Sequence, residues 1–139
     1  MEEIYNMRKY LIGLFFIISI FSFSEETGLG IIIDSDLKAV GVKEENIKKA
    51  KQLMSEVATS YRLKSLEIEQ LELQINKYVL DGPEKSLKEI DEIFDKIGRL
   101  EAAISKERIR SQINIQKLIT QEQYMKAREI AVKRLNGKK

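Results

Sequence analysis

The 139-residue sequence contains no cysteine and no histidine, and these two absences exclude several kinds of chemistry. Without cysteine the chain has no structural disulfide, no thiolate nucleophile and no cysteine to carry a lipid anchor. Without histidine it lacks the usual zinc ligand and the usual proton shuttle at neutral pH. A serine nucleophile would lack its ordinary base. We therefore expect no enzyme activity, no metal site and no cofactor.

Proline and tryptophan are also scarce, and the net charge is small. The chain has one proline, no tryptophan and a formal net charge of +2, while lysine, glutamate, isoleucine and leucine dominate. This composition favours long helices over sheets, so the predicted fold class is all-α. A charge so close to zero implies neither a polyanion nor a polycation as partner, and nucleic acid is not expected.

The first 24 residues have the pattern of a secretory signal. Arg8 and Lys9 precede an apolar run over residues 10–23, and Ser22 and Ser24 supply the small residues that a signal peptidase reads. The run has roughly 14 residues, fewer than the about 20 that a spanning helix needs, which disfavours a retained anchor. We predict cleavage near Ser24, no stable membrane anchor afterwards, and a location in the periplasm or outside the cell.

Residues 25–41 show no sustained helical or strand period. Gly28, Gly30 and Gly41 surround three consecutive isoleucines, residues 31–33. The segment is interpreted as a flexible N-terminal arm. In the alternative, the isoleucines dock on the helical body as a short edge segment.

Residues 42–139 are predicted to form one helical hairpin domain, and its first helix covers about residues 43–80. Apolar residues there recur at alternating intervals of three and four, and only Lys64 interrupts the series. This spacing is a heptad seam, which predicts lengthwise packing against a partner helix. The seam consists of Ile47, Ala50, Met54, Val57, Tyr61, Ile68, Leu71, Ile75 and Tyr78.

Asp81, Gly82 and Pro83 end that helix, and Pro83 suits the first turn of a second helix over about residues 83–118. A third helix is expected over about residues 120–136. The prediction is an elongated antiparallel helical hairpin with a short C-terminal helix. Its core would be modest, and dimerisation would enlarge it. The apolar face of the second helix is expected to comprise Leu87, Ile90, Phe94, Ile97, Leu100 and Ile104.

The start of the third helix carries a complete local signature. Thr120 and Gln123 have the spacing of a capping box, and the flanking residues Ile119 and Tyr124 that of a hydrophobic staple. A weaker copy starts the first helix, at Val42, Asn46 and Ile47. Both motifs stabilise helix starts rather than perform a reaction.

A second apolar stripe follows the first helix opposite the seam. Leu66, Leu73 and Leu80 recur every seven residues, with Leu63 nearby. The stripe is either the core of a dimer or an exposed face that binds other proteins. Basic residues, among them Arg108, Arg110 and Lys117, gather further along the chain. They either solvate the helices or form a positive rim that attracts acidic, partly unfolded polypeptides.

The order of these features resembles the Spy/CpxP/ZraP-like family of periplasmic stress proteins, whose mark is a Leu-Thr-x-x-Gln motif that often occurs twice. The second motif here reads Ile119, Thr120, Gln121, Glu122, Gln123, with isoleucine in place of leucine. The first reads Val42, Lys43, Glu44, Glu45, Asn46 and lacks the threonine. The resemblance implies a curved, antiparallel homodimer that shields unfolded envelope proteins without ATP.

The expected function is that of an ATP-independent envelope chaperone or stress adaptor, whose clients are unfolded or misfolded envelope proteins. Its client-binding candidates are the four leucines of the stripe with Arg108, Arg110 and Lys117. One alternative is a structural or adhesive secreted hairpin that self-assembles through the same stripe. The other is a metal-responsive periplasmic sensor domain, which the lack of histidine and cysteine disfavours.

Overall fold

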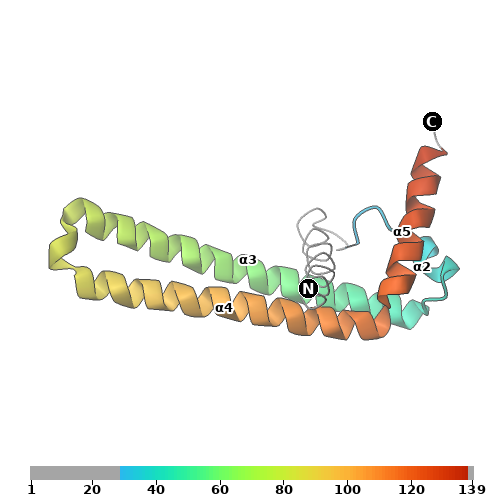
Figure 1. Ribbon diagram of the computed structural model, residues 1–139, viewed down its shortest axis with the longest axis horizontal. Helices are drawn as coiled ribbons and strands as arrows, with labels where there is room; N and C mark the ends of the chain where they lie inside the picture. Colours follow the sequence, from blue (N-terminus) through green and yellow to red (C-terminus); the bar gives the residue numbers. More distant parts are fainter. Residues whose placement is uncertain (1–28, 138–139) are drawn as a thin grey trace, which may run out of the picture. The chain divides into compact units, whose positions relative to one another are not determined.

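The computed structural model describes residues 29–137, and every regular element in this part of the chain is helical (Figure 1). The elements are α2 (Asp34–Ala39), α3 (Glu44–Asp81), the 3-10 helix η1 (Pro83–Lys85), α4 (Leu87–Leu118) and α5 (Gln121–Asn136). The all-α prediction is confirmed. The predicted signal over residues 1–24 lies outside the described residues. None of the helices within residues 29–137 is long and apolar enough to span a membrane.

The described chain divides into two compact units. One, here called the hairpin unit, is Val57–Arg110. The other, the terminal unit, joins residues 29–56 to residues 111–137, and so combines segments from both ends of the described chain.

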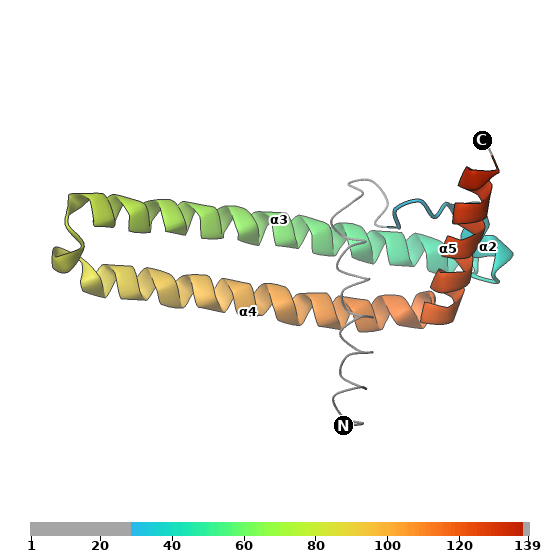
Figure 2. The same cartoon turned by 45° about the horizontal axis from the view of Figure 1, so that its top comes forward.

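In the hairpin unit, α3 and α4 run antiparallel and lie side by side in both views (Figures 1 and 2). Val57 and Leu71 of α3 are buried, as the seam predicts, together with Ile90 and Ile97 of α4. The predicted apolar face of α4 was partly wrong, because Leu87 and Phe94 are exposed and Ile93 is half-buried instead. The α4 seam therefore follows Ile90, Ile93, Ile97, Leu100 and Ile104.

The turn of the hairpin differs from the prediction that helix two starts at Pro83. Gly82 has a φ of +110°, which favours glycine, and Pro83 opens the 3-10 helix η1 rather than an α-helix. Ser86 follows with non-helical angles, and its carbonyl accepts the hydrogen bond from the Ile90 N–H at 2.9 Å. The α-helix therefore starts at Leu87.

A polar layer interrupts the seam of the hairpin unit. Lys64, the one polar residue in the predicted α3 seam, lies 3.0 Å from the Glu107 carboxylate and also donates to the Ser60 hydroxyl. Ser60 in turn donates to Glu107 at 2.8 Å. The hydrogen bonds from Lys64 and Ser60 hold the pKa of Glu107 below its ordinary value. Since a shift in register would separate these three groups, the layer favours one alignment of α3 against α4.

The terminal unit contains the main hydrophobic core. Leu37 of α2 is fully buried, and Ala127 and Ala131 of α5 have no exposed surface. The remaining buried members of this core are Leu29, Ile32, Val42, Ile47, Ala50, Met54, Ile115 and Ile119. Alanines at the two α5 positions allow α2 to pack closely on α5.

The predicted flexible arm is folded over residues 29–41. The segment contains α2, and the Ile32 side chain is buried, whereas Ile31 and Ile33 are exposed. The helix ends in a Schellman motif, in which the Val42 N–H donates to the Leu37 carbonyl and the Gly41 N–H donates to Lys38. Gly41 has the positive φ, +89°, that this motif requires. The alternative, in which the isoleucines dock on the helical body, agrees with the burial of Ile32 in the core, although the segment leads into a helix and does not form an edge segment.

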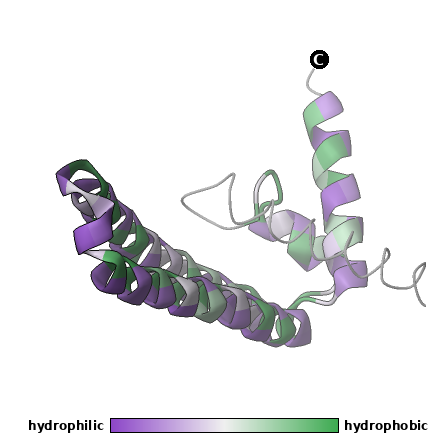
Figure 3. Cartoon of the chain, turned by 60° about the vertical axis from the view of Figure 1, so that its left-hand side comes forward, coloured by the Kyte–Doolittle hydropathy of each residue, from purple (hydrophilic) through white to green (hydrophobic). Residues whose placement is uncertain are grey.

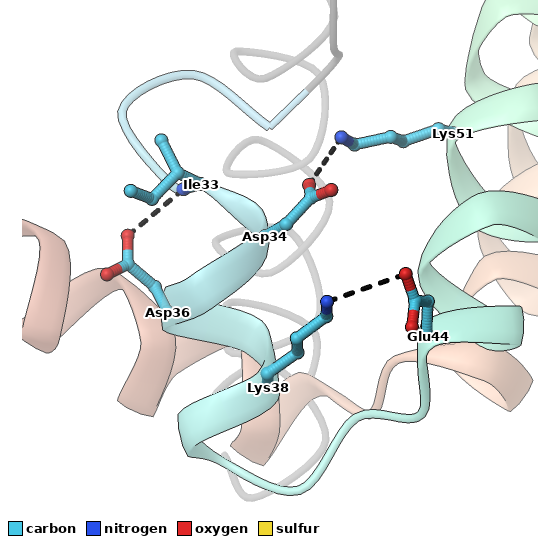
Figure 4. A network of polar contacts seen from close by, with 6 residues as sticks. All are labelled: Ile33, Asp34, Asp36, Lys38, Glu44 and Lys51. Atoms are coloured by element: carbon cyan, nitrogen blue, oxygen red, sulfur yellow. Dashed lines mark hydrogen bonds and ion pairs between the residues drawn. The ribbon is translucent and has the colours of Figure 1, made fainter.

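Polar contacts hold α2 in place within the terminal unit (Figure 4). The Ile33 N–H donates to the Asp36 carboxylate at 3.0 Å, and Asp34 forms an ion pair with Lys51 of α3. Lys38 lies 3.5 Å from Glu44. Asp36 itself is only 3% exposed and is bound by the Arg134 guanidinium of α5 at 3.0 Å. The start of α2 is thus tied to both α3 and α5.

Candidate functional site

The leucine stripe of α3 is the most exposed apolar feature among the described residues. Its members Leu66, Leu73 and Leu80 each follow a seam residue by five positions, which places them about 140° round the helix from α4. Their exposed fractions are 50%, 68% and 86%, and Leu63 is 64% exposed. Figure 3 shows hydrophobic stretches among hydrophilic ones along both helices of the hairpin unit. The stripe offers apolar contacts over about two turns on each side of Leu73.

The charges beside the stripe are mixed in sign. Arg62, Glu69 and Lys77 are exposed and alternate along this side of α3. A ligand lying on the stripe would meet both signs of charge whichever way it ran. The stripe therefore selects apolar side chains but no particular chain direction.

The three predicted basic candidates are divided between the two units. Arg108 stacks over the Tyr61 ring, with its guanidinium carbon 4.7 Å from the ring centroid. Tyr61, a seam residue, is nevertheless 44% exposed, and the cation–π contact covers part of its ring. Arg110 is exposed further along α4 in the hairpin unit, and Lys117 is exposed in the terminal unit. The three cations thus have different surroundings.

The capping motif has the geometry that its spacing predicts. The Gln123 N–H donates to the Thr120 hydroxyl, and the Thr120 N–H donates to the Gln123 side chain, both at 3.1 Å. Ile119 is buried in the terminal core and Tyr124 packs against that core. Burial raises the pKa of the Tyr124 hydroxyl. The motif fixes how the chain turns from α4 into α5.

The first, weaker motif packs in the same unit. Val42 and Ile47 are both buried in the terminal core. The Asn46 amide donates at 3.3 Å to the Leu118 carbonyl at the end of α4. This bond satisfies one of the carbonyls that a helix end leaves without a partner. Asn46 therefore joins the start of α3 to the end of α4, a role that the motif reading did not predict.

Replacing Thr120 by alanine should lower the free energy of unfolding by about 1 kcal/mol, because one N-terminal N–H of α5 loses its acceptor. Urea denaturation followed by circular dichroism measures the change. Thr59→Ala, an exposed position inside α3, is the matched control and should change stability by less than about 0.5 kcal/mol. An equal effect of both substitutions would contradict the capping role.

An open groove of about 570 Å³ lies between the two helices of the hairpin unit. Its lining includes Leu71 and Tyr78 of α3, and Glu92, Asp95, Lys96 and Arg99 of α4. Lys96 also forms an ion pair with Glu67 at 3.2 Å. With carboxylates and cations interleaved, the groove does not favour a ligand of either charge. Sequence reasoning did not find it, because it depends on Ile93 rather than Phe94 facing α3.

Within residues 29–137, no three acidic side chains are grouped so that they could hold a metal ion.

No protein family, curated protein or solved structure matches this chain.

Proposed function

We propose that this protein is an ATP-independent chaperone or stress adaptor of the cell envelope, which shields unfolded proteins through the leucine stripe of α3. The observation that carries the proposal is the exposure of Leu63, Leu66, Leu73 and Leu80, each at least half exposed on one helix. Ordered apolar surface of this kind marks an interaction site.

The form of the stripe suits unfolded chains as ligands. Unfolded proteins present apolar side chains at irregular intervals, so a row of separate leucines can bind many different sequences. The mixed charges beside the stripe impose no chain direction on the ligand. The stripe lies on a helix rather than in an enclosed pocket, which leaves room for extended polypeptides.

The proposed location rests on the sequence. The signal-like residues before Glu25 support export, and the Thr120 motif supports the resemblance to the Spy/CpxP/ZraP-like family. The capping box found at Thr120 and Gln123 is compatible with that resemblance, although a capping box occurs in many helical proteins.

The chaperone proposal predicts that the purified protein suppresses the aggregation of a reduced, unfolded model protein at stoichiometric amounts. Leu66→Ser with Leu73→Ser should remove at least half of this suppression, because two central apolar contacts become polar. Light scattering during aggregation measures the effect, and circular dichroism checks that both proteins are folded.

The matched control is Val79→Ser, which changes a residue that is 50% exposed on α3 but lies off the stripe. It should keep the suppression of the parent protein. Absence of suppression by the parent protein would contradict the chaperone function. If the double variant suppressed aggregation as well as the parent protein, the clients would bind to a surface other than the leucine stripe.

The same leucine stripe also supports a second candidate, an adhesive or structural hairpin that polymerises. Sizing by light scattering separates the two functions, since a defined small oligomer favours the chaperone and open-ended filaments favour the polymer. A metal-responsive sensor would bind zinc or copper stoichiometrically in calorimetry, and we expect no such binding.

A further inference from the structure

A second exposed apolar row lies on α4 of the hairpin unit. Leu87, Phe94 and Ile109 are 59%, 56% and 47% exposed, and Gly98 and Ala102 between them are exposed as well. Gly98, Ala102 and Ile109 each follow a seam residue of α4 by five positions, about 140° round the helix, so they point away from α3. These five residues are here called the α4 stripe.

The α4 stripe is symmetric in sequence about Gly98. Phe94 and Ala102 lie at equal distances before and after the glycine, and so do Leu87 and Ile109. Two copies of α4 packed antiparallel, with a two-fold axis at Gly98, would pair Phe94 with the small Ala102 of the other copy. Leu87 would meet Ile109 of that copy. A two-fold interface needs one self-complementary surface, and this pattern provides it.

Gly98 supports a close helix approach at the centre of this pattern. A glycine inside an exposed helix lowers helix stability relative to alanine. A Cβ atom placed on Gly98 would meet nothing within 4 Å, so no contact among the described residues requires the glycine. A second helix crossing at this point would use the missing side chain, because the two backbones could then approach closely.

The charges of α4 favour the same antiparallel orientation. Residues 88–95 contain four acidic side chains and one lysine, whereas residues 96–110 contain five basic and two acidic side chains. Antiparallel pairing about Gly98 brings Asp95 near Arg99 of the other copy and Glu92 near Lys106, each twice by symmetry. Like-charged approaches also occur, of Arg99 to Arg99 of the other copy beside the axis, and of Lys88 to Lys106 and Arg110 at the outer end. In a parallel pair, the acidic half of α4 would lie against the acidic half of the other copy, and the basic half against the basic half.

We propose that a second copy of this chain packs antiparallel on the α4 stripe, with the two-fold axis at Gly98. The interface uses the outer side of α4 and leaves the leucine stripe, on the outer side of α3, open to other ligands. The inference stands on the self-complementarity of α4 and does not depend on chaperone activity.

Cysteine cross-linking tests the interface directly, because the chain has no cysteine of its own. A residue on the two-fold axis meets its own copy, so Gly98→Cys should give a disulfide-linked dimer under mild oxidation. The pair Phe94→Cys with Ala102→Cys should also cross-link, and it leaves Gly98 unchanged. Leu73→Cys, at the centre of the leucine stripe, is the control and should stay monomeric on a non-reducing gel.

Charge exchange tests the orientation. Glu92→Lys and Lys106→Glu should each raise the dimer dissociation constant about threefold to tenfold, because both symmetric ion pairs become repulsive. The double exchange should return the constant to within about twofold of the parent value. Glu69→Lys on α3 should leave it unchanged. Sedimentation velocity measures all four variants, and high salt should reduce the differences.

Three results would overturn the proposal. One is a parent protein that stays monomeric at every concentration. Another is cross-linking through Leu73→Cys but through neither α4 variant. The third is a double charge exchange, Glu92→Lys with Lys106→Glu, that does not restore the dimer dissociation constant. None of these results depends on aggregation suppression, so this interface and the proposed function can fail separately.

Discussion

Replacing Leu37 by alanine should lower the free energy of unfolding by about 2–5 kcal/mol, which would destabilise the terminal unit severely. Leu37 is the largest fully buried side chain among the described residues, and it packs in a core formed from both ends of the described chain. The substitution removes buried methyl groups and leaves a cavity that the short helix α2 cannot easily fill by moving, because Asp34 and Asp36 tie it to Lys51 and Arg134. Chemical denaturation followed by circular dichroism measures the loss.

Ile31→Ala is the matched control for Leu37→Ala. It also truncates an aliphatic side chain in the same segment, but Ile31 is 44% exposed, so the expected cost is below about 1 kcal/mol. If Leu37→Ala cost no more than this control, α2 would not belong to the core, and the interpretation of residues 25–41 as a flexible arm would be preferable.

Replacing Asp36 by alanine should cost about 3–5 kcal/mol, because the substitution leaves the charge of Arg134 partly buried without its carboxylate. Asp36 is 3% exposed and accepts hydrogen bonds from the Ile33 N–H and from Arg134, both at 3.0 Å. Arg134 also donates to the Ile31 carbonyl at 3.0 Å, so the whole start of α2 depends on this contact.

Two further variants separate the causes of this loss. Asp36→Ala combined with Arg134→Met removes both charges and should recover part of the stability, because no unpaired charge remains in the interface. Lys51→Met breaks the more exposed ion pair with Asp34 and should change stability by less than about 1 kcal/mol. If the double variant were no more stable than Asp36→Ala alone, an unpaired Arg134 would not be the main cause.

The Asp36 contact also predicts how stability depends on pH. Burial alone raises the pKa of this carboxyl, but the hydrogen bonds from Arg134 and Ile33 and the charge of Arg134 outweigh it and hold the pKa below 3.8. The contribution of Asp36 is therefore complete above about pH 5 and is lost as the pH falls through 3.8 and below. Asp36→Asn should make the free energy of unfolding less dependent on pH in this acidic range.

The long helices could be predicted because their signals are local and repeated. The intervals of three and four along α3 located that helix to within a residue at each end, and the Thr120 and Gln123 spacing located the start of α5. The start of α4 lies four residues beyond Pro83, which opens the 3-10 helix instead. Ser86 and Glu89 have capping-box spacing and mark the observed start better.

The fold of residues 29–41 was harder to predict because its stabilising contacts come from distant parts of the chain. A helix of six residues has little stability alone, and α2 depends on Arg134 and on the small Ala127 and Ala131 of α5. One local signal was available, since Leu37 followed by Gly41 and Val42 fits a Schellman ending. The seven-residue period placed the α3 leucines on one side of the helix, but the period alone left open whether that side is a dimer core or an exposed face.

The attachment of α2 to α5 has a consequence for the order of folding. Its hydrogen bonds join residues 98 and 103 positions apart, while the polar layer of the hairpin joins residues 43 and 47 apart. The loop-closure entropy of the longer contacts is larger, and during synthesis they cannot form until α5 has been made. We therefore expect α3 and α4 to pair early in folding and α2 to pack on α5 later. A chain that stops before Arg134 would leave α2 without the partner that holds it.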